Sequence, residues 1–157
     1  MDKLAVIDEV IKALQHEIDI GSKASREAFE AATDEDSYSD GKYDTRSLEA
    51  SYLAGGQAQI VKELGDALQG FNLMKAQHFI TPPSLQIGLG SLMEIKGSNS
   101  NTWYIVGPGG GGMDIEVNGT AITVLTLHSP LGLSLASKRE GDEVEMPESK
   151  ATVLQVI

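Results

Sequence analysis

Residue types that support several kinds of chemistry are scarce or missing in this chain of 157 residues. It has no cysteine, which excludes disulfide bonds, thiolate zinc sites and cysteine nucleophiles. Only 12 lysines and arginines stand against 23 aspartates and glutamates, and the net charge of −11 argues against a dedicated nucleic-acid binder and against docking on an anionic membrane. No apolar run reaches the length of a membrane-spanning helix, and the amino terminus lacks a signal-peptide pattern. The composition predicts a soluble, cytoplasmic protein.

The first half of the chain predicts two long helices, because residues 1–77 contain no proline and their apolar residues recur at alternating spacings of three and four. In the first helix the predicted seam comprises Leu4, Ile7, Ile11, Leu14, Ile18, Gly21, Ser25, Ala28 and Ala32. In the second it comprises Ala50, Leu53, Gln57, Ile60, Leu64, Ala67 and Phe71, with Gly55 and Gly56 as an interruption that costs about 1 kcal/mol per glycine. Paired antiparallel, two helices of about 30 residues would form a finger about 45 Å long. A helical bundle and a dimeric coiled coil are the alternatives.

An acidic segment joins the two predicted helices. Residues 33–45 hold five carboxylates and one lysine, together with serine, glycine and aspartate residues that favour turns. Most charged runs of this kind are solvated loops. Carboxylates at the end of a rigid rod can also hold a hard cation such as Mg²⁺ through one or two ligands, while water and phosphate complete its coordination.

The pattern changes after Pro82-Pro83, which end the helical stretch. Short β-rich runs follow at residues 89–95, 102–106, 113–117, 121–127 and 151–157, and Asn118-Gly119 predicts a hairpin turn. Residues 130–137 predict one short helix, and the almost wholly apolar last strand is expected in or near the centre of the sheet. The fold class is therefore α+β, with an antiparallel coiled-coil finger over residues 1–77 and a small antiparallel sheet with one helix over residues 78–157.

Other residues carry no recognisable chemistry. Pro108 and the four glycines after it predict a flexible hairpin loop rather than a phosphate-binding loop, because a strand with Asp114 and Glu116 follows instead of a helix amino terminus. The three histidines are dispersed, which argues against a histidine zinc site. No serine lies in a Gly-x-Ser-x-Gly motif.

The second half carries a run that resembles the signature of the GreA/GreB transcript cleavage factors: Ser129-Pro130-Leu131-Gly132, then Leu135, Lys138, Gly141-Asp142 and Val144. That resemblance implies an FKBP-like fold for residues 78–157, and a carboxyl-terminal domain that docks at the rim of the secondary channel of RNA polymerase. The implied polymerase-binding residues are His128, Ser129, Pro130, Leu131 and Gly132. At position 128 the family usually has an acidic residue, and the glycine run stands where the family has Glu-Ala-Asp.

The same resemblance implies that the finger enters the polymerase channel and brings its tip carboxylates to the catalytic Mg²⁺, so that the polymerase hydrolyses nascent RNA in backtracked complexes. Alignment with the family tip makes Asp36 and Asp40 the catalytic and Mg²⁺-binding pair, with Asp44 as the substitute if the register differs. The chain would be a monomeric cofactor protein and not itself an enzyme. It would bind Mg²⁺ only together with RNA polymerase and would act on nascent RNA indirectly.

Two alternatives remain open at the level of sequence. The chain could occupy the polymerase channel as a regulator without promoting cleavage. An FKBP-like fold also suggests a prolyl isomerase or chaperone, but that activity needs an aromatic-lined pocket, and residues 80–157 contain only Trp103 and Tyr104 as aromatic residues.

Overall fold

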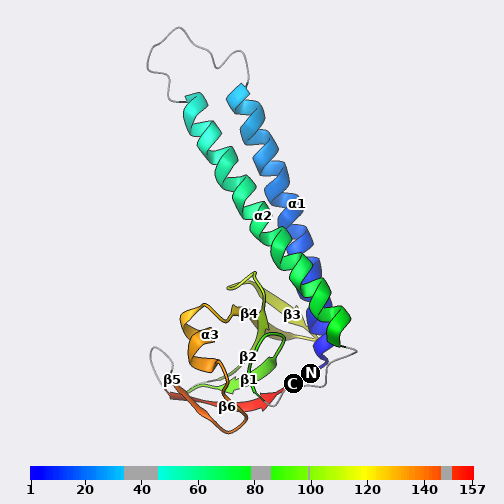
Figure 1. Ribbon diagram of the computed structural model, residues 1–157, viewed down its shortest axis with the longest axis vertical. Coiled ribbons are helices and arrows are strands. Elements are labelled where there is room, and N and C mark those ends of the chain that lie inside the picture. Colours follow the sequence, from blue (N-terminus) through cyan, green and yellow to red (C-terminus); the bar gives the residue numbers. More distant parts are fainter. Residues whose placement is uncertain (34–45, 79–85, 99, 146–149) are drawn as a thin grey trace.

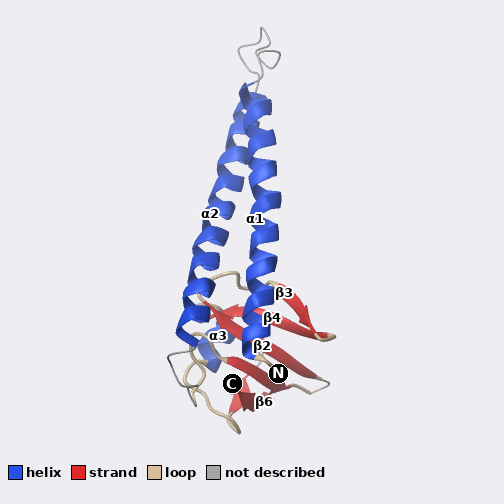
Figure 2. Ribbon diagram, turned by 90° about the vertical axis from the view of Figure 1, so that its right-hand side faces the viewer, coloured by secondary structure: helices blue, strands red, loops and turns tan. Residues whose placement is uncertain are grey.

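The computed structural model describes residues 1–33, 46–78, 86–98, 100–145 and 150–157. Of residues 31–33, 46–48, 50 and 78 only the backbone is described, so the predicted seam positions Ala32 and Ala50 lie outside the described side chains. Two long helices, α1 (Lys3–Thr33) and α2 (Arg46–His78), form an antiparallel hairpin that projects well beyond a six-stranded sheet (Figures 1 and 2). The predicted α+β architecture is confirmed. Among the described residues, no helix has the length and apolar character needed to cross a membrane.

The sheet is mixed, which corrects the prediction of a wholly antiparallel sheet. Its strand order is β3-β4-β2-β1-β6-β5, and β2 and β4 are parallel. The connection between these two strands, residues 108–119, carries β3 on the outside of β4, and a connection of about a dozen residues is long enough for a parallel crossover. The strands are β1 (Leu92–Lys96), β2 (Asn101–Gly107), β3 (Asp114–Val117), β4 (Thr120–Thr126), β5 (Glu143–Glu145) and β6 (Lys150–Val156).

Several local predictions are confirmed. Asn118 and Gly119 connect β3 to β4 with φ angles of 53° and 75°, and two positive φ angles are the requirement of a type I′ hairpin turn. The last strand, β6, is interior because it pairs with both β1 and β5. The short helix α3 (Pro130–Leu135) ends two residues before the predicted end. Strand β5 was not predicted, because three residues with two glutamates give no apolar pattern.

The sheet is covered on both faces. Adjacent residues of one strand point to opposite faces, so Leu92 belongs to a cluster with the foot of the hairpin, whereas Met93 belongs to a second cluster with α3. Ile105 and Val106 on β2 divide in the same way. The first cluster joins helix residues to strand residues: Val6, Ile7, Val10, Leu14, Ala67, Phe71, Met74, Leu92, Ile105, Ile115, Val117, Ile122 and Val124. The hairpin and the sheet therefore share a hydrophobic core, and the predicted division of the chain at residues 77 and 78 stays a prediction.

The hairpin seam on α1 follows the predicted pattern. Its buried positions recur every seven residues: Ile7, Leu14, Gly21 and Ala28. The seam thins from leucine to glycine and alanine away from the sheet, and Ser25 Oγ donates a hydrogen bond across it to the carbonyl oxygen of Ala54 at 3.4 Å. Less apolar area is buried per turn toward the far end of the finger.

On the far half of α2 the predicted seam is wrong at two positions. Leu53 and Ile60 are exposed, and the next residue in each case, Ala54 or Val61, is half-buried instead. The reason is the close approach of the helices: a Cβ atom at Gly21 would lie only 2.8 Å from Val61 Cγ2. Helix α2 also continues without a break through its Gly55-Gly56 pair.

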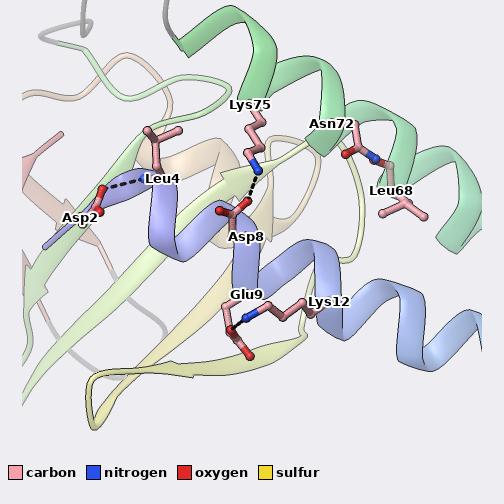
Figure 3. Close-up of polar contacts among 8 residues, drawn as sticks. All are labelled: Asp2, Leu4, Asp8, Glu9, Lys12, Leu68, Asn72 and Lys75. Atoms are coloured by element: carbon pink, nitrogen blue, oxygen red, sulfur yellow. Dashed lines mark hydrogen bonds and ion pairs between the residues drawn. The ribbon is translucent and has the colours of Figure 1, made fainter.

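Polar contacts fix the foot of the hairpin (Figure 3). Asp2 Oδ1 accepts a hydrogen bond from the backbone N–H of Leu4 at 3.0 Å, as an N-cap residue does. Asp8 on α1 and Lys75 on α2 point toward each other and form an ion pair with an Oδ1–Nζ distance of 2.6 Å. The Asp8–Lys75 pair thus links the two helices near the sheet, and the Asp2 contact caps the start of α1.

Candidate functional site

The predicted tip site lies outside the described residues. Asp36, Asp40 and Asp44 belong to the segment that joins the last residue of α1, Thr33, to the first residue of α2, Arg46. These two helix ends are at the end of the hairpin remote from the sheet (Figure 1). The donor set is chemically suited to Mg²⁺, because carboxylate oxygens are its preferred protein ligands. In the part of the chain that is described, no three potential ligand side chains form a metal cluster.

The Ser-Pro-Leu-Gly motif forms the start of α3. Ser129 is the N-cap: its Oγ accepts a hydrogen bond from the backbone N–H of Gly132 at 3.0 Å and donates one to the carbonyl oxygen of Thr126 at 2.8 Å. Pro130 occupies the first helical position, where its missing N–H has no cost. The motif therefore sets a sharp corner between β4 and α3.

Only glycine fits at position 132, because the backbone of the strand end lies too close for a Cβ atom. A Cβ atom at this residue would lie 1.9 Å from the carbonyl oxygen of Thr126, and Gly132 is buried. Backbone atoms cannot move aside as a flexible side chain can, so the strand end and the helix approach each other only with glycine here. Gly132 therefore has a steric role inside the protein that the sequence did not predict, whereas Ser129 caps the helix, as its place before Pro130 predicts.

The surface of the corner comes from other side chains. His128 and Pro130 are exposed, and Leu131 is half-buried against the cluster under α3. Leu133, which sequence reasoning missed, has 64% of its surface exposed, a high fraction for a leucine on a short helix.

The glycine run, predicted as a flexible hairpin loop, forms a packed joint with α2. It connects β2 to β3 and lies against α2: a Cβ atom at Gly109 would be 2.8 Å from Ala67 Cβ, and one at Gly70 would be 2.4 Å from Pro108 Cγ. Gly110 and Gly112 have φ angles of 70° and 88°, which residues with a Cβ atom rarely adopt. Small residues on α2 and in the loop therefore let the two backbones approach each other closely.

The first and last parts of the chain are also joined near the foot of the hairpin. Lys3 Nζ donates hydrogen bonds to the carbonyl oxygens of Gly90 at 3.2 Å and of Ile157 at 2.9 Å. Partial burial lowers the pKa of Lys3 from its ordinary value of 10.5, because desolvation disfavours the charged ammonium. With the glycine joint and the shared core, this contact ties the direction of the finger to the sheet that carries the Ser129 corner.

No protein-family model and no curated protein sequence matches the chain. Solved structures do resemble it along nearly the whole length. The crystal structure of GreA factor homolog 1 (Gfh1) of Thermus thermophilus is 18% identical and covers 94% of this chain and 94% of its own, with a TM-score of 0.35. A structure described as the transcription factor Gfh1 is 18% identical and covers 96% of this chain and 92% of its own, with a TM-score of 0.37.

Proposed function

We propose that this protein is a transcription elongation factor that binds RNA polymerase in its secondary channel and stimulates cleavage of nascent RNA in backtracked complexes. The supporting observation is that one chain combines the Ser129–Gly132 corner with an acidic segment between the far ends of a long hairpin. Helix α1 has 31 residues and extends about 45 Å. A finger of these proportions encloses no substrate alone, but it can carry carboxylates into a cavity of another protein.

The chemistry at the tip would be two-metal phosphoryl chemistry with a shared ion. Mg²⁺ held between the polymerase and Asp36 and Asp40 would stabilise the attacking oxygen and the developing negative charge. The two aspartates contribute negative charge and hard oxygen ligands, and the polymerase contributes the remaining coordination and the RNA. On the isolated chain we expect weak Mg²⁺ binding or none, because hydration competes with two carboxylates in water. The protein is therefore a ligand donor and not itself an enzyme.

Binding and cleavage are separated by substituting the tip. Asp36→Asn combined with Asp40→Asn keeps the side-chain shape but removes the charge that a hard cation requires. With a backtracked polymerase complex that contains end-labelled RNA, the double variant should bind as the wild type does and lose stimulated cleavage. Asp44→Asn is the control for the alignment of the tip and should have a smaller effect. Unchanged cleavage by the double variant would contradict the role of these carboxylates.

A regulator that occupies the channel without cleavage is the second candidate. It is favoured by one departure from the Gre tip sequence: Asp40 stands where the family has glutamate, and its side chain is shorter by one methylene group. The same assay distinguishes the two. A wild-type protein that binds the polymerase and blocks access to its channel, but never shortens the labelled RNA, would favour the regulator.

A further inference from the structure

An apolar strip continues from the shared core onto the exposed part of the finger. On α1, Val6 is buried, Ala13 is half-buried, and Ile20 is 51% exposed. Residues seven apart in a helix lie within about 20° of the same direction. These side chains therefore lie on the face that packs on the sheet at the foot of the hairpin, and Ile20 lies beyond the sheet.

Helix α2 has a matching strip. Ala67 is buried against the glycine joint, Ile60 is 49% exposed, and Leu53 is 57% exposed, again at intervals of seven residues. Ile60 lines a groove of about 490 Å³ with Pro108 and the glycine run, so this face is directed to the sheet side. We call Ile20, Leu53 and Ile60 the finger strip.

The three residues of the finger strip lie on one side of the hairpin. Gly21 and Val61 meet at the seam, and Ile20 and Ile60 each precede the seam residue by one position. Because the helices are antiparallel, a step of one residue backward turns both side chains to the same side. Leu53 lies seven residues from Ile60, about 10 Å farther along α2. Large apolar side chains at this spacing suit an apolar segment of a partner laid along the finger.

The charged side chains beside the finger strip are mostly carboxylates. At three or four residues from its members lie the exposed carboxylates of Glu17, Glu49 and Glu63, one beside each apolar residue. Among the described residues at the same spacings, Lys23 carries a positive charge. It forms an ion pair with Glu27, with an Nζ–Oε1 distance of 3.9 Å. Glu63 Oε1 accepts a hydrogen bond from Gln59 Nε2 at 2.8 Å.

We propose that the finger strip binds an apolar segment of RNA polymerase that is flanked by lysine or arginine residues. This inference rests on the proposed function. It adds which face of the finger contacts the polymerase and which residue types of the polymerase bind there. A partner with basic flanks places opposite charges beside the carboxylates, which favours encounter and orientation. A second copy of this chain fits the strip poorly, because it presents the same carboxylates and a net charge of −11.

The test compares one substitution at two positions of α2. Leu53 and Leu73 are both 57% exposed, and Leu73 lies on the other side of the helix. Binding of the labelled full-length chain to purified RNA polymerase of the source organism should weaken at least about fivefold for Leu53→Gln and stay within about twofold for Leu73→Gln. Glu49→Gln with Glu63→Gln should weaken binding and reduce its dependence on salt. Circular dichroism shows whether each variant keeps the helical content of the wild type.

The outcomes separate this inference from the proposed function. If the wild type does not bind the polymerase, the proposed function fails. If the wild type binds and Leu53→Gln binds as tightly as Leu73→Gln, the finger strip is not a contact surface, although the proposed function stands. Sedimentation of the wild type alone is the third measurement: self-association that Leu53→Gln abolishes would assign the strip to a second copy and overturn the inference.

Discussion

The contact between α2 and the loop after β2 can be tested by substituting two glycines of the same helix. A Cβ atom at Gly70 would lie 2.4 Å from Pro108 Cγ and 2.8 Å from Pro108 Cβ, whereas a Cβ atom at Gly65 would have no neighbour within 4 Å. Both residues lie inside α2 and neither has a positive φ angle. The substitutions Gly65→Ala and Gly70→Ala therefore differ mainly in the contact with Pro108.

The expected magnitudes follow from two opposing effects. Replacing glycine by alanine within a helix raises the free energy of unfolding by about 1 kcal/mol. At Gly65 this gain is unopposed, so Gly65→Ala should stabilise the protein by about that amount. At Gly70 overpacking against Pro108 costs about 1–3 kcal/mol, which cancels or exceeds the gain. The difference between the variants is thus about 1–3 kcal/mol, or about 2–12 °C in Tm for a chain of this size.

Urea unfolding followed by far-ultraviolet circular dichroism measures this difference, and Pro108→Gly provides a further control. Without the proline ring, Gly70→Ala should lose most of its penalty, which gives a coupling of at least about 0.5 kcal/mol in a double-mutant cycle. Equal stabilisation by Gly65→Ala and Gly70→Ala, or the absence of coupling, would refute the packed joint. The direction of the finger would then not be set by this loop.

Two further predictions concern the corner of α3 and the lysines of α1. Gly132→Ala should lower the free energy of unfolding by more than about 1 kcal/mol, because the added Cβ clashes with the Thr126 carbonyl oxygen. Leu133→Asp should leave the free energy of unfolding unchanged but weaken polymerase binding in a competition assay. An NMR titration should find the pKa of Lys3 below 10.5 because of its burial, and the pKa of Lys12 above 10.5 because of its hydrogen bond to Glu9. The contribution of Lys3 to the free energy of unfolding should then rise with pH between its lowered pKa and 10.5, and the contribution of Lys12 should be lost as pH rises through its raised pKa. A pKa of Lys3 above that of Lys12 would contradict both the burial of Lys3 and the hydrogen bond of Lys12 as causes.

Local sequence determined most of the secondary-structure elements of this protein. The absence of proline and the spacing of apolar residues were sufficient for the two long helices, and Asn118-Gly119 was sufficient for the β3–β4 turn, because each signal depends on backbone preferences within a few residues. Ser129 and Pro130 were likewise recognisable as the start of a helix. The tip carboxylates are a prediction from a family resemblance and fall outside the described residues.

Tertiary structure decided which apolar residues meet. Helix α2 carries two apolar stripes, and only packing shows that Ala54 and Val61 face α1 while the stripe of Leu53 and Ile60 continues onto the sheet side. The role of the glycine run is decided in the same way. Glycine is common both in flexible loops and where two segments approach closely, so the sequence does not distinguish the two until the neighbouring segment is known. The parallel pairing of β2 and β4 is also a choice between distant segments. Each of these features depends on contacts between residues far apart in the chain, and a periodic pattern in one segment does not specify its partner.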